Sequence, residues 1–152
     1  MTGTFRATIE IKATPDAVYR QFVEPERLVH WMGDVARLEA VEGGVFSIDI
    51  NGVLIRGHFV ALEHNRRIEV AWGELGNAAM PSGATRLVIE LAAIPGSTRL
   101  TLTRSGLAED EAEKHAIGWP HFLARFMTCT EIHDPGSDPW AIASTDKPDV
   151  EP

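Results

Sequence analysis

The sequence predicts an α+β domain in which a curved antiparallel sheet of about six to seven strands wraps around one long C-terminal helix. Three observations support this prediction. Strand-like runs separated by turn residues fill the chain between residues 35 and 104. A strand and two short helices precede them, and an amphipathic segment from about residue 108 to 132 follows them. A helix packed on one face of such a sheet defines an α+β fold.

The first elements are a strand and two short helices. Residues 5–11 alternate apolar and polar side chains, as a half-buried strand does. Thr14 is a good N-cap and Pro15 suits the first helical position, so a short helix begins there. Pro25 disfavours helical geometry at the residue before it, and apolar spacing predicts a second short helix over residues 25–32.

The middle of the chain is predicted to be an antiparallel meander. Its strand-like runs are Val35–Ala40, Val45–Ile50, Val53–Leu62, Arg67–Trp72, Ala84–Ile94 and Thr98–Arg104. Gly43-Gly44 and Asn51-Gly52 provide the positive φ that tight hairpins need. The connection Gly73–Gly83 is longer than the others, and we mark it as a candidate lid.

A long amphipathic helix is predicted after the meander. One apolar stripe of this helix contains His115, Trp119, Phe122, Phe126 and Cys129. Pro120 lacks the N–H that would bond to the carbonyl one turn earlier, so we expect a kink. We therefore expect one domain over residues 1–134, followed by a flexible tail over residues 135–152 in which Trp140 is the residue able to dock.

Composition excludes several classes of protein. At 152 residues the chain suits one domain. A formal charge of −8 and a pI near 5.2 oppose binding to nucleic acid. The single Cys129 forms no intrachain disulfide, and residues 1–4 lack the pattern of an export signal. No apolar run approaches the roughly 18 residues of a membrane span, so we expect a soluble cytoplasmic protein.

The predicted architecture leaves room for a cavity. A twisted sheet of about seven strands curls, and one helix does not fill its whole concave side. The predicted lining is aromatic and apolar, with a histidine from the sheet and one from the helix; its residues are Trp31, Phe46, Ile48, His58, Val70, Trp72, His115, Trp119, Phe122 and Phe126. The alternative is that these side chains meet and form a filled core.

Polar candidates each have a structural alternative. His115 lies one helical turn before Trp119 and either tops the cavity or lies on the helix surface. His58 shares one strand face with Arg56 and Val60, which is either cavity or solvent. Arg104 either pairs with an acidic ligand or, as we favour, with a surface carboxylate such as Glu109.

Motifs for other chemistry are missing from the sequence. No metal-ligand spacing and no glycine-rich phosphate loop occurs, so we expect neither a metal site nor a nucleotide cofactor. Cys129 and His133 are four residues apart, as a nucleophile and its base would be, but a buried inert thiol is the preferred interpretation. No catalytic residue is assigned.

An ordered series of motifs runs through most of the chain. It consists of residues 14–22, Pro25-Glu26-Arg27-Leu28, Trp31, Glu42-Gly43-Gly44-x-Phe46, Gly57, Arg66-Arg67-Ile68, Trp72, Thr98-Arg99-Leu100-Thr101-Leu102 and Gly118-Trp119. From about Phe5 to Met127 this series resembles the homologues of the heat-shock protein ATPase activator, in the START-like, Bet v 1-like (SRPBCC) superfamily. The resemblance implies a helix-grip fold and a deep hydrophobic cavity. Pro120 departs from the family pattern.

Three functions follow from these observations as hypotheses. The first is a binding domain for a small apolar or aromatic molecule. The second is a cyclase-like or hydratase-like enzyme, as found elsewhere in the superfamily, in which His58, His115 or Arg104 polarises a carbonyl or moves a proton. The third is a co-chaperone-like interaction protein, whose chaperone partner is implied by the resemblance alone. A homodimer is an open alternative in all three.

Overall fold

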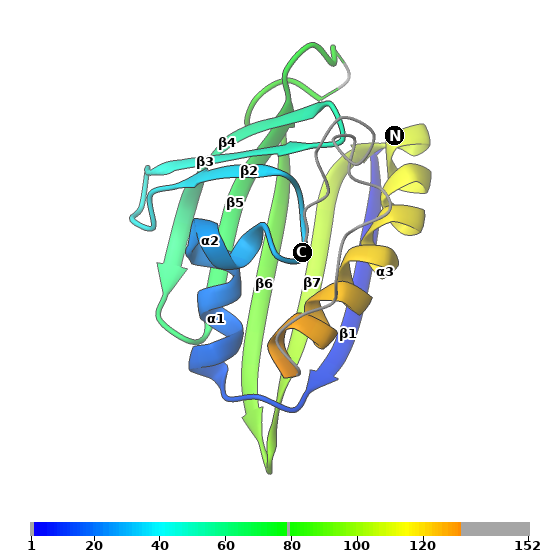
Figure 1. Cartoon of the computed structure of the whole chain (residues 1–152). Helices are drawn as coiled ribbons and strands as arrows, with labels where there is room; N and C mark the ends of the chain where they lie inside the picture. Colours follow the sequence, from blue (N-terminus) through cyan, green and yellow to red (C-terminus); the bar gives the residue numbers. More distant parts are fainter. Residues whose placement is uncertain (1, 79, 132–152) are drawn as a thin grey trace, which may run out of the picture.

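A seven-stranded antiparallel sheet and three helices make up the part of the chain that the computed structural model describes, residues 2–78 and 80–131 (Figure 1). In chain order the elements are β1 (Thr2–Ile11), α1 (Pro15–Val23), α2 (Pro25–Leu28), β2 (Val35–Leu38), β3 (Val45–Ile50), β4 (Val53–Glu63), β5 (Arg67–Glu74), β6 (Thr85–Ile94), β7 (Ser97–Ala108) and α3 (Glu109–Glu131). The predicted tail, Trp140 and His133 lie outside the described residues.

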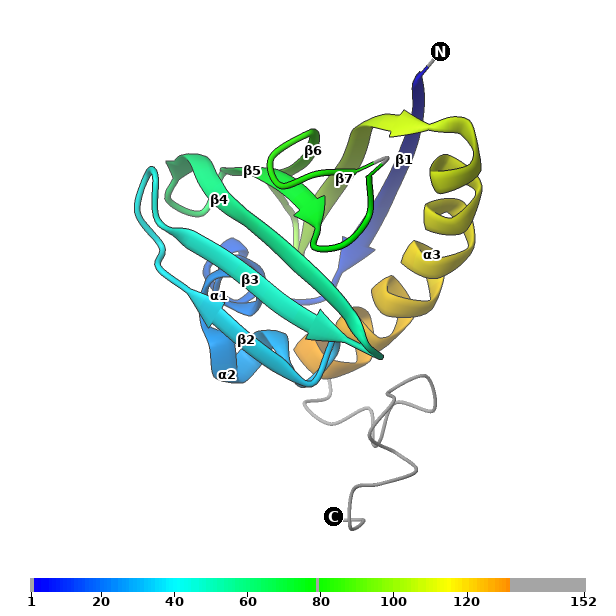
Figure 2. The ribbon, with the colours of Figure 1, turned by 90° about the horizontal axis from the view of Figure 1, so that it is seen from above.

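The strand order is β1-β7-β6-β5-β4-β3-β2. The strands from β2 to β7 therefore pair in sequence order, as predicted, and α1 and α2 connect the two edge strands. Figures 1 and 2 show the sheet curving around the helices; α1 packs on β6 and β7, α2 lies beside β2, and α3 runs along β7 and β1. This arrangement confirms the predicted helix-grip α+β fold.

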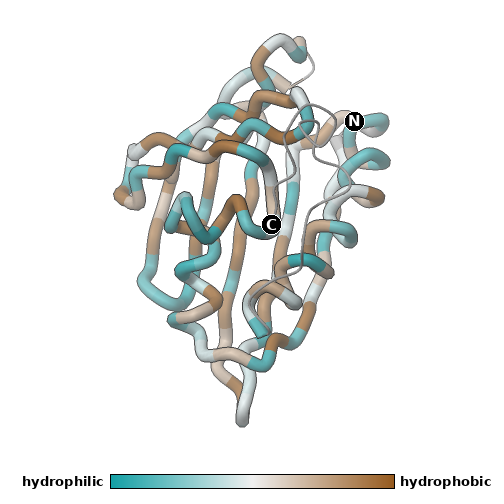
Figure 3. Tube along the Cα trace, viewed as in Figure 1, coloured by the Kyte–Doolittle hydropathy of each residue, from teal (hydrophilic) through white to brown (hydrophobic). Residues whose placement is uncertain are grey.

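The alternation predicted for the strands is visible in their burial. In β7, Thr98, Leu100, Leu102 and Arg104 are buried at every second position and share the face turned toward the helices. β6 is buried at every second position from Thr85 to Leu91 in the same way, and Figure 3 shows bands of hydrophobic and hydrophilic residues along the strands. An arginine thus continues an otherwise uncharged buried row.

The first short helix begins at a capping side chain, whereas the second has no side-chain cap. The Oγ1 atom of Thr14 accepts a hydrogen bond from the backbone N–H of Ala17 at 3.2 Å, and Pro15 is the first residue of α1. The second helix ends at Leu28, four residues earlier than predicted. Trp31 and Met32 nevertheless reach the core, because hydrogen-bonded turns continue the chain direction beyond the helix.

Gly57 allows two aromatic side chains to meet across the sheet. It lies on β4 between Phe46 of β3 and Trp72 of β5, and the rings of these neighbours are 5.7 Å apart. A Cβ atom at position 57 would lie 1.7 Å from the carbonyl oxygen of Ala71. The close backbone approach therefore requires glycine here.

Aromatic rings fill the interior next to α1 and α2. Phe126 of α3 is fully buried and contacts Phe22 at 5.0 Å and Trp31 at 4.9 Å between ring centres. Phe46 and Phe59 form a further edge-to-face pair at 5.5 Å. This half of the space between sheet and helix is a packed core.

The long helix α3 is continuous and contains Pro120 in its interior. Figures 1 and 2 show it bending as it runs from the end of β7 toward α1, which agrees with the kink expected from proline. Its last residue, Glu131, accepts a hydrogen bond from the backbone N–H of Lys12 at 2.7 Å. None of the described helices is long and apolar enough to cross a membrane.

Candidate functional site

A cleft of about 220 Å³ lies between the first half of α3 and the sheet region where β4 begins and β5 ends. Its lining consists of Met32, Ile50, Val53, Ile55, Trp72, Glu74, Glu111, Lys114, His115, Gly118, Trp119 and Phe122. Apolar side chains from the sheet face aromatic ones from the helix. Polar groups are confined to Glu74 on β5 and to the first turns of α3.

Aromatic rings form much of the cleft wall. Trp72 of β5 and Trp119 of α3 have ring centres 5.8 Å apart, and Phe122 continues the wall at 6.5 Å from Trp119. Both tryptophans are buried, whereas Phe122 is half-buried. The wall is therefore apolar, and its two tryptophans are fixed by burial.

Gly118 leaves one side of the cleft open. An added Cβ atom at this position would meet no heavy atom within 4 Å, and the residue lies in the interior of α3. Glycine is a poor helix former, less favourable than alanine by about 1 kcal/mol. Part of the free space thus comes from a missing side chain rather than from a gap between elements.

Arg104 lies behind this wall and is fully buried. One of its terminal nitrogens donates hydrogen bonds to Thr85 Oγ1 at 3.0 Å and to the carbonyl of Arg86 at 2.7 Å. Its guanidinium carbon lies 4.6 Å from the ring centre of Trp72, a cation–π contact. No carboxylate among the described side chains forms an ion pair with it.

His115 links Arg104 to the helix. Its Nδ1 atom accepts a hydrogen bond from Trp119 Nε1 at 3.0 Å and a longer one from Arg104 Nε at 3.5 Å. Its ring also meets the edge of Trp72 at 6.4 Å between centres. Two donors therefore converge on one imidazole nitrogen.

The charges of these groups follow from burial. Desolvation, followed by the nearby cations Arg104 and Lys114, lowers the pKa of His115 to about 4. Burial also lowers the pKa of Arg104 to about 9, against the attraction of Glu74. At neutral pH the imidazole is therefore uncharged and the guanidinium is a cation.

The rim of the cleft carries a polar network. Glu111 is buried; its carboxylate pairs with Lys114 at 3.3 Å and accepts a hydrogen bond from Asn77 Nδ2 at 3.4 Å. Asn77 belongs to the connection predicted as a lid. In the same connection Met80 is fully buried, and its carbonyl accepts a hydrogen bond from the N–H of Glu74 at 2.7 Å. This connection is thus tied both to the core and to α3.

The structure brings together four of the ten predicted lining residues: Trp72, His115, Trp119 and Phe122. The other apolar members do not line the cleft but are buried in the core; they are Trp31, Phe46, Ile48, Val70 and Phe126. The alternative of a filled core thus describes one half of the interior. The open cleft occupies the other half.

The prediction for His58 as a lining residue was wrong. His58 is exposed on β4 and pairs with Val45, whereas Phe59 beside it is fully buried. Neighbouring residues of a strand point to opposite faces. Because the larger and more apolar Phe59 takes the inner face, His58 points to solvent.

Sequence reasoning missed several members of the site. Ile55 shares the inner face of β4 with Phe59, and the alternation of that strand carried this signal. Glu111 and Gly118 lie four residues before and three after His115, on the same side of the helix. The predicted pairing of Arg104 with Glu109 involves a side chain outside those the structure describes.

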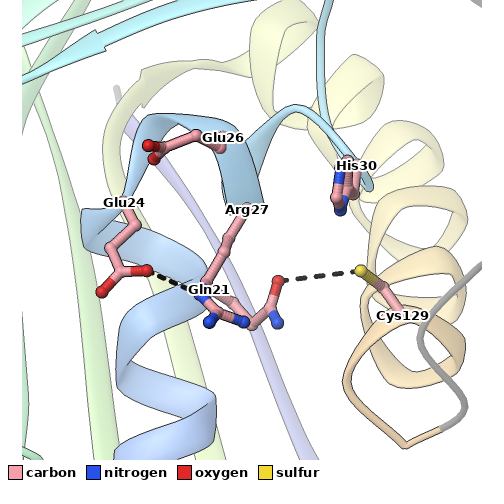
Figure 4. A pocket seen from close by; sticks show the side chains of 6 residues that line it. All are labelled: Gln21, Glu24, Glu26, Arg27, His30 and Cys129. Carbon is pink, nitrogen blue, oxygen red and sulfur yellow. Dashed lines mark hydrogen bonds and ion pairs between the residues drawn. The ribbon is translucent and has the colours of Figure 1, made fainter.

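A second hollow of about 450 Å³ lies between α2 and the end of α3 (Figure 4). Its walls are polar and carry an ion pair between Arg27 and Glu24, and the buried Cys129 thiol lies 3.7 Å from Gln21 Oε1. Glu26, Arg27 and His30 are exposed. No group of three or more potential metal ligands was found among the described residues. The hollow lacks the apolar walls of a ligand site, so the cleft is the candidate site.

Comparison with solved structures places the chain among proteins of the same fold. An AHSA1-like protein from Rhizobium etli is 28% identical over 92% of this chain and 89% of that one, with a TM-score of 0.72. The Aha1 dimer from Colwellia psychrerythraea is 23% identical over 88% and 99%, with a TM-score of 0.76. CalU16 from Micromonospora echinospora is 20% identical over 88% and 76%, with a TM-score of 0.72.

A comparison with curated proteins by sequence gave no match. The sequence profile described as "Activator of Hsp90 ATPase homolog 1-like protein" matches residues 12–131. This range contains all three helices, six of the strands and every residue that lines the cleft. The chain belongs to the family of activator of Hsp90 ATPase homolog 1-like proteins.

Proposed function

We propose that the protein binds a small aromatic or apolar molecule in the cleft beside α3. One observation carries the proposal: the rings of Trp72, Trp119 and Phe122 form an apolar wall next to the open space at Gly118. Planar aromatic walls bind rings through offset or edge-to-face contacts. Burial of the ligand's apolar surface, at about 25 cal/mol per Å², drives binding.

The volume of the cleft limits the size of the ligand that it can hold. Sites for drug-sized ligands measure about 300–1,000 Å³, whereas an apolar cavity of roughly 150 Å³ holds benzene. A cleft of about 220 Å³ lies between these values. It therefore suits a molecule with one ring and a short substituent.

The test is to fill the cleft from the protein side. Gly118→Leu adds a side chain where the structure has open space, and it replaces a poor helix former by a good one. The fold is therefore expected to be as stable as that of the wild type. Ala116→Leu, on the exposed side of the same helix, is the matched control.

Ethylbenzene is the probe, and the indole N–H signals in ¹H–¹⁵N spectra are the readout. In the wild type and in Ala116→Leu, the signals of Trp72 and Trp119 are expected to move with ethylbenzene while that of the core residue Trp31 stays in place. In Gly118→Leu no signal is expected to move. Equal binding to a folded Gly118→Leu variant, or no binding to the wild type, contradicts the proposed function.

A further inference from the structure

The hydrogen bonds at His115 define which nitrogen of its ring carries the proton. Trp119 Nε1 and Arg104 Nε are both donors, and both point at Nδ1. An imidazole nitrogen that accepts hydrogen bonds carries no hydrogen, so in the neutral ring the proton is on Nε2. The network therefore holds His115 as an Nε2–H donor.

This donor is available to a molecule in the cleft. His115 is half-buried and lines the cleft, and none of the described residues accepts a hydrogen bond from its Nε2 atom. The atom is also not enclosed by protein. The Nε1–H of Trp72, another lining residue, is buried without an acceptor in the described part of the chain. Two donors in an apolar wall thus lack an acceptor.

The charges around the cleft decide between a charged and a neutral acceptor. Two cations, Arg104 and Lys114, are balanced by two carboxylates, Glu74 and Glu111. Both carboxylates and Lys114 line the cleft, whereas Arg104 lies behind the wall. An anionic ligand would lose its hydration beside two like charges, and the one cation that lines the cleft, Lys114, is already paired with Glu111.

Resting on the proposed function, we propose that the cleft selects an aromatic molecule with an uncharged carbonyl group, which accepts a hydrogen bond from Nε2–H of His115. Trp119 is a positioning residue in this arrangement, because its indole holds the imidazole in the donating form. The apolar wall provides affinity, and His115 provides selectivity for the carbonyl.

Three probes of similar size test the proposal at pH 7: acetophenone, ethylbenzene and benzoate. They share the ring and differ in the substituent, which is a ketone, an alkyl chain or a carboxylate. A net hydrogen bond corresponds to a preference of about 3- to 10-fold, so acetophenone is expected to bind that much more tightly than ethylbenzene. Benzoate is expected to bind most weakly of the three.

Variants test whether His115 causes the preference for acetophenone over ethylbenzene. His115→Phe keeps an aromatic ring without nitrogen, and the ratio of the acetophenone and ethylbenzene affinities is expected to fall to about one. His58→Phe, on the solvent side of the sheet, is the matched control and is expected to keep the wild-type ratio. Trp119→Phe is a second variant, which removes the donor to Nδ1 and is expected to reduce the ratio.

The outcomes separate the two proposals. If acetophenone and ethylbenzene bind the wild type equally, the carbonyl proposal is overturned while the proposed function stands. If benzoate binds most tightly, the ligand is an anion and the carbonyl proposal is again overturned. If no probe binds, the proposed function itself fails.

The tautomer is measured directly on the wild-type protein. Long-range ¹H–¹⁵N spectra of the imidazole distinguish a protonated Nε2 from a protonated Nδ1. The Nε2–H form is expected for His115 at pH 7. An Nδ1–H form would overturn the proposal without any variant being made.

Discussion

The two halves of α3 present similar aromatic side chains to different surroundings. Near its end, Phe126 is fully buried between Phe22 and Trp31. In its first half, Trp119 packs against Trp72 but borders a cleft beside Gly118. The halves therefore differ in what lies opposite the helix rather than in the helix itself.

The residues opposite explain the difference. α1 and the turns after α2 bring Phe22 and Trp31 to the second half of α3, and these rings fill the space. At the first half, the connection after β5 brings Met80 to Arg104 but adds no aromatic ring to the cleft wall. Packing stabilises one end of the molecule, whereas unfilled space remains next to the other end.

Phe126→Ala is expected to have the largest effect on stability. Removal of a fully buried phenylalanine costs about 3–5 kcal/mol of unfolding free energy, because the transfer and cavity costs add. Urea denaturation monitored by circular dichroism measures this loss. The variant that remains folded is expected to bind ethylbenzene as the wild type does. Loss of binding with an unchanged free energy of unfolding would show that the second half of α3 binds the ligand and is not the packed core.

Low pH is expected to lower the free energy of unfolding, because the pKa of His115 in the cleft is lowered in the folded protein. The pKa of His115 is about 4 in the folded protein, against an ordinary value of 6.5, so the unfolded chain binds more protons between these pH values. The free energy of unfolding therefore falls as pH decreases from about 6.5 to 4, by about 2–3 kcal/mol from this group. Urea titrations at several pH values measure it. His115→Phe is expected to flatten the slope, and an unchanged slope would contradict the shift.

The substitution Arg104→Met tests how much the charge of Arg104 contributes to the lowered pKa of His115. Burial is the largest cause and the charge of Arg104 is the next, so removing the charge is expected to raise the pKa of His115 while leaving it below its ordinary value. The ¹H shift of the imidazole followed against pH measures it. Arg67→Met, at the opposite end of β5 from Trp72, is the control. A pKa that does not move would show that the charge of Arg104 does not contribute to the shift.

Much of the fold could be predicted because its signals are local. Thr14 and Pro15 mark the start of α1, and the alternation in β7 places Arg104 on the inner face. The outward position of His58 depends on which face of β4 is buried, which the pattern around His58 left open. The open space at Gly118 depends on what packs against α3. Such facts arise from tertiary packing and have no signal within a short window of sequence.

Most of the cleft was missed for the same reason. The sequence predicted one aromatic lining along the whole helix, because the stripe from His115 to Cys129 is continuous. Half of this lining became core when α1 and the turn containing Trp31 packed onto it. An amphipathic stripe identifies the buried side of a helix but does not distinguish a filled interior from a lined cavity.

Phe122→Ala is expected to have the smallest effect on stability and a clear effect on binding. Phe122 is half-buried, so its removal costs about 1–2 kcal/mol of unfolding free energy, less than the loss of a core phenylalanine. Because it forms one wall of the cleft, ethylbenzene affinity is expected to fall several-fold. Met127→Ala is the matched control: this side chain is half-buried on the same helix but does not line the cleft. Equal affinities for the two variants would show that the ligand does not contact Phe122. The two halves of α3 would then not differ in ligand binding.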